Sequence, residues 1–222
     1  MAVVANYPKL SGDWLRHELD PRLYREEVTI VAGTGDLATG SVLGKLTTGA
    51  ATSAAKSGGN TGNGTMGAVT VAADAQVGVY QLRIVEAGTD AGQFQVKDPQ
   101  GDVIGIGTVG VAFAGGGLSF TLADGSSDFI LGDGFDITVA AGNAKWAWHN
   151  PTLTNGAQVA AGILLHAVDA SGGSDVKGVV VTGECEVVAL NLGWHASVDD
   201  ATKKNAALAQ LATKGIRTRQ LA

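Results

Sequence analysis

Short segments with a two-residue hydrophobic period recur along this chain of 222 residues and limit the folds that it can adopt. Such alternation is typical of strands that bury one face. Turn signals that contain glycine, including the Asp-Gly pairs at 124–125 and 133–134, separate the segments. The pattern predicts a mainly β protein, with a small sandwich or barrel over residues 68–140. The clearest alternating positions are Val69 and Val71; Tyr80, Leu82 and Ile84; Phe94 and Val96; Leu118, Phe120 and Leu122; and Phe135, Ile137 and Val139.

The C-terminal region adds one helix to this pattern. Residues 179–188 alternate as a half-buried strand does, whereas the apolar residues after Ser197 have helical spacing. Ser197 with Asp200 predicts an acidic variant of the capping box at the start of the helix, and Gly215 predicts its end. Residues 216–221 predict a short edge strand. The predicted fold class is therefore mainly β with one C-terminal α-helix.

Composition predicts a discontinuous core domain that carries an insertion. Residues 25–50 and 145–222 contain the strands and the helix of the core, while residues 68–140 form a separate β-rich module. Residues 51–67 are nearly all Gly, Ala, Ser, Thr and Asn, a composition typical of a flexible linker. We interpret the module as an insertion into a loop of the core, which costs little closure entropy.

Residues 1–24 precede the core and follow neither period. Pro8 and Pro21 interrupt them. This arm either folds back on the core or stays loose until it meets a partner, and aromatic residues on an otherwise loose terminus favour the second interpretation. Its large side chains are the candidate binding residues: Tyr7, Trp14, Leu15, Leu19, Leu23 and Tyr24.

Charge and cysteine content exclude several classes of function. The formal net charge is −6 and Lys and Arg form no block, so neither nucleic acid nor an anionic membrane is an expected partner. The first residues lack the pattern of a signal peptide, and the longest apolar run, 159–168, is too short to span a bilayer. We expect the protein to stay in a cytosol-type compartment or to be assembled there into something larger. Cys185 is the only cysteine, which rules out an intramolecular disulfide and a Cys-based zinc site; we predict a buried, unreactive side chain.

The acidic run Asp124, Asp128, Asp133 and Asp136 is the best candidate for a metal site or a catalytic carboxylate pair. Calcium loops place oxygen ligands at short alternating spacings and end in a bidentate Glu. Here the spacings are four, five and three, and no Glu follows. Asp before Gly is also typical of tight turns, so turn formation is the preferred interpretation. We predict no metal and no cofactor.

The remaining motifs do not support catalysis. His17, His149, His166 and His195 are scattered without metal-binding spacing, and no Gly-x-Ser-x-Gly motif occurs, although a triad assembled in space stays open. His166, on a strand, is predicted to be a core or interface residue. Residues 105–110 are rich in glycine but lack the strand and helix of a dinucleotide site. The protein is predicted not to be an enzyme.

Three groups of motifs, in the right order, resemble one family. The C-terminal motifs resemble the end of the head decoration proteins of lambda-type tailed phages, the N-terminal motifs resemble the opening of their longer members, and the middle motif resembles their central strand. Together they cover residues 25–50 and 145–222; the module at 68–140 is a departure, because the shortest members lack it. The motifs are ECEVVAL at 184–190, ASVDDATKK at 196–204 and GIR at 215–217; REEVTI at 25–30 and GSVLGK at 40–45; and NGAQVAAGIL at 155–164.

The resemblance implies a non-enzymatic homotrimer on the outer surface of the expanded virion capsid, assembled in the host cytoplasm. It would bind the major capsid protein and stabilise the head against internal DNA pressure. In the family, the N-terminal arm becomes ordered on the capsid by adding a strand to a capsid-protein edge. Residues 1–24 are then the expected capsid-binding arm.

Two other functions stay open. The module at 68–140 could bind carbohydrate or a host surface, which would require exposed aromatic residues around a groove. The Asp cluster could serve a hydrolase, which would require two carboxylates facing each other across a cleft.

Overall fold

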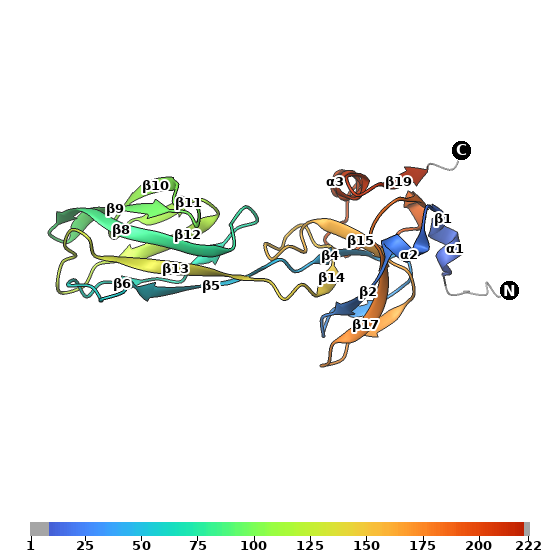
Figure 1. The fold of residues 1–222 in the computed structure, drawn as a ribbon, viewed down its shortest axis with the longest axis horizontal. Coiled ribbons are helices and arrows are strands. Elements are labelled where there is room, and N and C mark those ends of the chain that lie inside the picture. The colour runs from blue at the N-terminus through green and yellow to red at the C-terminus, as the bar shows by residue number, and fades with distance from the viewer. Residues whose placement is uncertain (1–8, 220–222) are drawn as a thin grey trace. The chain divides into compact units, whose positions relative to one another are not determined.

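The computed structural model describes residues 9–219 of the chain (Figure 1). Strands make up 46% of the protein and helices 11%, so the predicted mainly β class with a C-terminal helix is confirmed. The chain divides into two compact units: unit 1 is Met1–Leu46 with Ala144–Ala222, and unit 2 is Thr47–Asn143. No helix within residues 9–219 is both long and apolar enough to cross a membrane.

Unit 1 is built on a closed five-stranded barrel. Its interior holds a cluster of buried side chains that includes Ile30, Leu43, Trp146, Leu164 and Val180. Both halves of the discontinuous unit contribute strands to the barrel, β2 and β4 from the first half and β14, β15 and β17 from the second, so the barrel closes only when both halves are present. In the order in which neighbours pair, the strands are β14 (Trp146–Trp148), β2 (Arg25–Ile30), β17 (Val176–Val181), β15 (Ala160–Leu164) and β4 (Val42–Lys45).

Two smaller sheets and the helices complete unit 1. The strand pair β3 (Gly35–Leu37) and β16 (Val168–Ala170) is antiparallel. In a three-stranded sheet, β18 (Cys185–Val188) lies between β1 (Leu15–Glu18) and β19 (Ile216–Arg219). A second buried cluster packs the helix α3 against the barrel and this sheet through Ala207 and Leu211. The helical segments are α1 (Ser11–Trp14), α2 (Pro21–Tyr24), the 3-10 turn η1 (Ala189–Asn191) and α3 (Ala201–Ala212).

The predicted strand over 179–188 is broken in the structure. β17 ends at Val181 and β18 begins at Cys185, and the turn between them puts Glu184 at a φ of 27°. The helix starts later than predicted, because Asp200 rather than Ser197 is the N-cap. The Asp200 side chain accepts a hydrogen bond from the Lys203 backbone N–H at 2.8 Å. The final strand lies at a sheet edge, as predicted, over Ile216–Arg219.

Unit 2 is a β-sandwich. The inward faces of its two sheets meet in one core that contains all five phenylalanines of the chain and Tyr80. The five-stranded sheet is β10 (Val103–Thr108), β9 (Ala91–Lys97), β8 (Gly78–Gly88), β13 (Gly134–Ala141) and β5 (Thr48–Ala55). The four-stranded sheet is β11 (Ala112–Gly115), β12 (Leu118–Ala123) and β6 (Thr65–Met66), with β7 (Thr70–Val71) also pairing with β12.

The prediction of a flexible linker over residues 51–67 is wrong. β5 pairs with β13 along most of its length, and β6 pairs with β12. Between them, the Asp133 carboxylate accepts hydrogen bonds from the backbone N–H groups of Thr61 and Gly62 at 3.0 and 2.9 Å. The glycines allow close packing: a Cβ atom at Gly62 would lie 2.7 Å from the ring of Phe129. The small-residue composition therefore serves close backbone approach.

The prediction of a loose arm is wrong for residues 9–24. Trp14 is fully buried, and its Nε1 donates a hydrogen bond to Thr39 Oγ1 at 2.9 Å. The indole lies against Gly40, where a Cβ atom would come within 2.9 Å of Trp14 Cδ1. β1 follows at once and pairs antiparallel with β18. The prediction failed because four-residue helices and a four-residue strand are too short to show a period.

Replacing the anchoring indole tests this packing. Trp14→Ala should lower the free energy of unfolding of unit 1 by about 3–5 kcal/mol, because it leaves a cavity and removes the hydrogen bond to the Thr39 hydroxyl. The measurement is urea denaturation followed by circular dichroism. Leu19→Ala is the control, since Leu19 is 67% exposed and its loss should change stability by less than about 0.5 kcal/mol. Equal effects of the two variants would contradict the packing described.

Candidate functional site

The segment 9–24 is fixed to unit 1 by polar contacts at both of its ends. Lys9 Nζ donates to the Asn191 carbonyl at 2.6 Å, and Asn191 Nδ2 donates to the Asp13 carbonyl at 2.7 Å. At the other end, Arg25 and Glu18 form a salt bridge at 2.6 Å. Its Glu18 carboxylate is largely buried, and the Arg25 Nε also donates to both of its oxygens, an arrangement stronger than a single exposed ion pair. The segment therefore presents a defined surface.

The structure separates the six predicted binding residues. Trp14 is in the core, and Leu15 and Tyr24 are half-buried. Tyr7 lies outside the described residues. Of the five that the structure describes, only Leu19 and Leu23, 67% and 68% exposed, present their side chains to solvent.

Sequence reasoning missed two exposed leucines of unit 1. Leu10, at the start of α1, is 66% exposed, and Leu190, in η1, is 87% exposed. Leu190 borders a groove of about 570 Å³ whose other walls include Leu208, Ala209 and Arg219. Isolated exposed leucines carry little information, but a leucine at the rim of an apolar groove is typical of an interaction surface. The signal in the sequence was an apolar residue just beyond the alternating segment 179–188.

The predicted acidic run divides into residues with different tasks. Asp133 is buried and accepts three backbone hydrogen bonds, from Thr61, Gly62 and Ile130. These bonds outweigh the effect of burial and hold the pKa of Asp133 below its usual value. Asp136 instead pairs with Arg83 at 2.7 Å. Both residues are structural.

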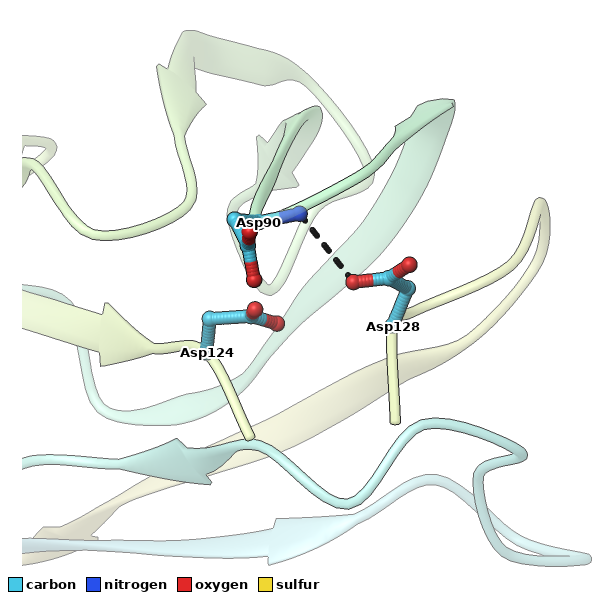
Figure 2. A group of neighbouring side chains, drawn as sticks. All are labelled: Asp90, Asp124 and Asp128. Atoms are coloured by element: carbon cyan, nitrogen blue, oxygen red, sulfur yellow. Dashed lines mark hydrogen bonds between the residues drawn. The ribbon is translucent and has the colours of Figure 1, made fainter. Parts of the chain in front are cut away.

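Asp124 and Asp128 meet a third carboxylate that the sequence analysis did not consider. Asp90 lies in the turn between β8 and β9, and Figure 2 shows the three side chains together. One carboxylate oxygen of each lies within 4.8 Å of the others. The residues come from two loops that are far apart in sequence, which is why spacing alone could not bring them together.

The histidines and the cysteine are placed as follows. His166 is exposed, so it is not a core residue, and an interface role for it stays a prediction. His17 is exposed on β1. His195 Nδ1 lies 2.8 Å from Ser197 Oγ, which in turn donates to Asn150 Oδ1. Cys185 is buried as predicted, and burial raises the pKa of its thiol to about 12, so it stays protonated at neutral pH.

His149 is the buried titratable group of the barrel unit. It is 2% exposed, and its Nδ1 lies 3.2 Å from the Ala157 carbonyl, the geometry of a ring that donates from Nδ1. Burial lowers the pKa of His149 below 6.5; the contact with Ala157 opposes this effect, and His195 adds to it.

The lowered pKa predicts a loss of stability in mild acid. Because the folded-state pKa lies below the unfolded value, the unfolded chain binds more protons, and stability is lost as the pH falls below about 6.5. The slope due to this residue cannot exceed about 1.4 kcal/mol per pH unit. His149→Asn, which keeps an N–H donor, should flatten the profile in urea titrations between pH 7 and pH 5. His166→Asn is the matched control and should leave the slope unchanged.

Comparison with known proteins identifies the family. The family model described as "Bacteriophage lambda head decoration protein D" matches residues 4–216. This chain belongs to that family. Membership implies a capsid decoration role at the surface of the virion capsid, and the family is structural and non-enzymatic.

Other comparisons add no functional information about this decoration protein. No curated protein matches the chain. Two crystal structures of Xanthomonas campestris FlgL are similar to parts of it, at 19% and 21% identity. They cover 46% and 47% of this chain, both with a TM-score of 0.33. This chain matches 33% of each FlgL chain.

Proposed function

We propose that this decoration protein binds the outer surface of the expanded head as a homotrimer and stabilises the head against internal DNA pressure. The observation that carries the proposal is the family match over residues 4–216. The major capsid protein is the partner. Binding does not depend on a reaction, and its strength comes from repeating the same contact in each copy.

We assign capsid contact to the N-terminal part of unit 1, residues 1–24. β1 already pairs with β18, so its residues form part of the protein's own sheet. Because β1 is an edge strand of this sheet, β-augmentation there would use only its outer edge; we assign the strand that adds to a capsid-protein edge to the residues that precede α1 rather than to all of residues 1–24. Within residues 9–24, the exposed Leu10, Leu19 and Leu23 supply apolar surface for the same contact.

Trimer formation would turn a weak contact into a firm attachment. When three linked copies bind together, each later contact is intramolecular, so the overall affinity exceeds that of one copy without any new contact. The groove beside α3, with the 87% exposed Leu190 at its rim, provides an apolar surface for self-association within unit 1. Assembly of the subunits in the host cytoplasm precedes attachment to the head.

Truncation tests whether residues 1–8 supply the strand that binds the capsid protein. Deleting residues 1–8 should abolish co-sedimentation with expanded, DNA-filled heads while leaving the oligomer unchanged in analytical ultracentrifugation. The cut ends before Lys9, so the contacts of Lys9 and Trp14 with unit 1 remain.

A control separates loss of binding from loss of folding. Circular dichroism of the shortened chain should match that of the full chain. Retained capsid binding by a folded protein without residues 1–8 would refute the assignment. Removal of residues 1–24 is uninformative, because it also removes Trp14 from the core.

The alternative role for the inserted module, binding carbohydrate, lacks its expected basis. All six aromatic residues of unit 2 are buried: Tyr80, Phe94, Phe113, Phe120, Phe129 and Phe135. Stacking of sugar rings requires exposed aromatic faces, and unit 2 offers none. Contact of unit 2 with a host surface stays open, and we assign capsid binding to unit 1.

Deletion of unit 2 tests this assignment. Leu46 and Ala144 are joined by a backbone hydrogen bond of 3.0 Å, and β4 and β14 pair directly beyond them. Residues 47–143 can thus be replaced by Asn-Gly to give a two-residue hairpin turn. The shortened protein should fold and keep its affinity for heads within about threefold, measured by co-sedimentation. A loss of more than tenfold in a folded variant would place part of the binding surface in unit 2.

A further inference from the structure

We propose that Asp90, Asp124 and Asp128 form a Ca²⁺ site in unit 2. The three side chains come together where the β8–β9 turn meets the loop that follows β12 (Figure 2). Figure 2 shows the carboxylate of Asp124 directed toward those of Asp90 and Asp128. Nothing in the proposed capsid function requires this arrangement, and the inference is independent of that function.

The carboxylate of Asp124 is the observation that points to a ligand. Its Oδ1 atom is buried and has no hydrogen-bond partner among the residues that the structure describes. A buried carboxylate oxygen without a donor is costly, because it has lost water without gaining a partner. A cation beside it would supply the missing interaction.

The three negative charges also lack a protein counter-charge. No salt bridge within residues 9–219 joins Asp90, Asp124 or Asp128 to a Lys or Arg; Asp136, later in the same acidic run, has Arg83 by contrast. Like charges at this separation repel one another, and water screens the half-buried Asp124 less than it screens the exposed Asp90 and Asp128. A divalent ion would neutralise most of that charge.

The surrounding loops hold the carboxylates in place. Asn63 Oδ1 accepts from the Ser127 N–H at 2.9 Å, and Asn63 Nδ2 donates to Ser126 Oγ at 2.9 Å, so the loop between Asp124 and Asp128 is clamped. Asp128 Oδ1 accepts from the Asp90 backbone N–H at 3.1 Å, which ties the two loops together. A site with fixed ligands binds more tightly than one that must be ordered on binding.

The ligand set favours calcium over magnesium. Ca²⁺ takes oxygen ligands at about 2.3–2.6 Å in flexible geometry, so one ion can span oxygens within 4.8 Å of one another. Mg²⁺ requires shorter distances and a near-ideal octahedron. Asp90 and Asp128 are exposed, which leaves room for water to complete the shell. Only three side chains contribute, so we expect a Kd of about 10⁻⁴ to 10⁻³ M.

The experiment uses the full chain after dialysis against EDTA. Calorimetric unfolding with 10 mM CaCl₂ should raise the Tm of unit 2 by roughly 5 °C or more, and 10 mM MgCl₂ should have a clearly smaller effect. Hydrogen exchange with CaCl₂ should slow at residues 88–91 and 124–130 and stay unchanged in unit 1. No shift with CaCl₂, or an equal shift with MgCl₂, would overturn the proposal.

Three variants separate binding from structure. Asp124→Asn and Asp90→Asn should each abolish the CaCl₂-dependent shift. Asp74→Asn, an equal change of charge at an exposed position of unit 2, should keep it. In EDTA, Asp124→Asn should be at least as stable as the wild type, because one of three like charges is gone. Lower stability in EDTA would show that Asp124 is a structural residue without a cation, and would overturn the proposal.

Discussion

The burial of Trp14 determines which part of the N-terminal region is available for binding. Its indole N–H donates to the Thr39 hydroxyl, which donates in turn to the Leu165 carbonyl at 2.7 Å. Thr39 is itself buried, so this chain of hydrogen bonds is shielded from water and is worth more than a surface contact. With Trp14 fixed, β1 is held against β18, and the residues after Leu10 belong to the folded unit. Residues 11–24 are therefore part of the fold of unit 1.

The insertion of unit 2 is compatible with the barrel because of one local feature. The chain leaves unit 1 at Leu46 and returns at Ala144, and hydrogen bonds between Leu46 and residues 144 and 145 close the barrel at that place. β4 and β14 are therefore neighbours in an antiparallel pair, as the two strands of a hairpin would be. The sandwich has its own core, which buries the aromatic side chains of unit 2. Each unit thus satisfies its own packing, and unit 2 takes the place of a hairpin loop.

Sequence patterns predicted the fold class well because the long strands of unit 2 have one solvent-exposed face and one buried face. In β8, for example, Tyr80, Leu82 and Ile84 are buried while Val79, Gln81 and Val85 are exposed. The same reasoning failed where structure depends on contacts rather than on period. Residues 51–67 are ordered by strand pairing and by the carboxylate of Asp133, which lies far along the chain. Residues 9–24 are ordered by one indole and a short strand, and neither leaves a periodic signal.

The candidate binding residues show the same limit. Large apolar side chains in a polar segment could be recognised from the sequence, but which of them face solvent could not. The sequence favoured a partner contact for Trp14, whereas in the structure its indole lies against Gly40 and donates to Thr39 in the core. For the acidic residues, composition suggested turns, and this interpretation fits Asp133. Composition could not distinguish Asp133 from Asp124, because the two differ in their hydrogen-bond donors. Three backbone N–H groups donate to the carboxylate of Asp133, whereas no donor within the described chain reaches Asp124 Oδ1.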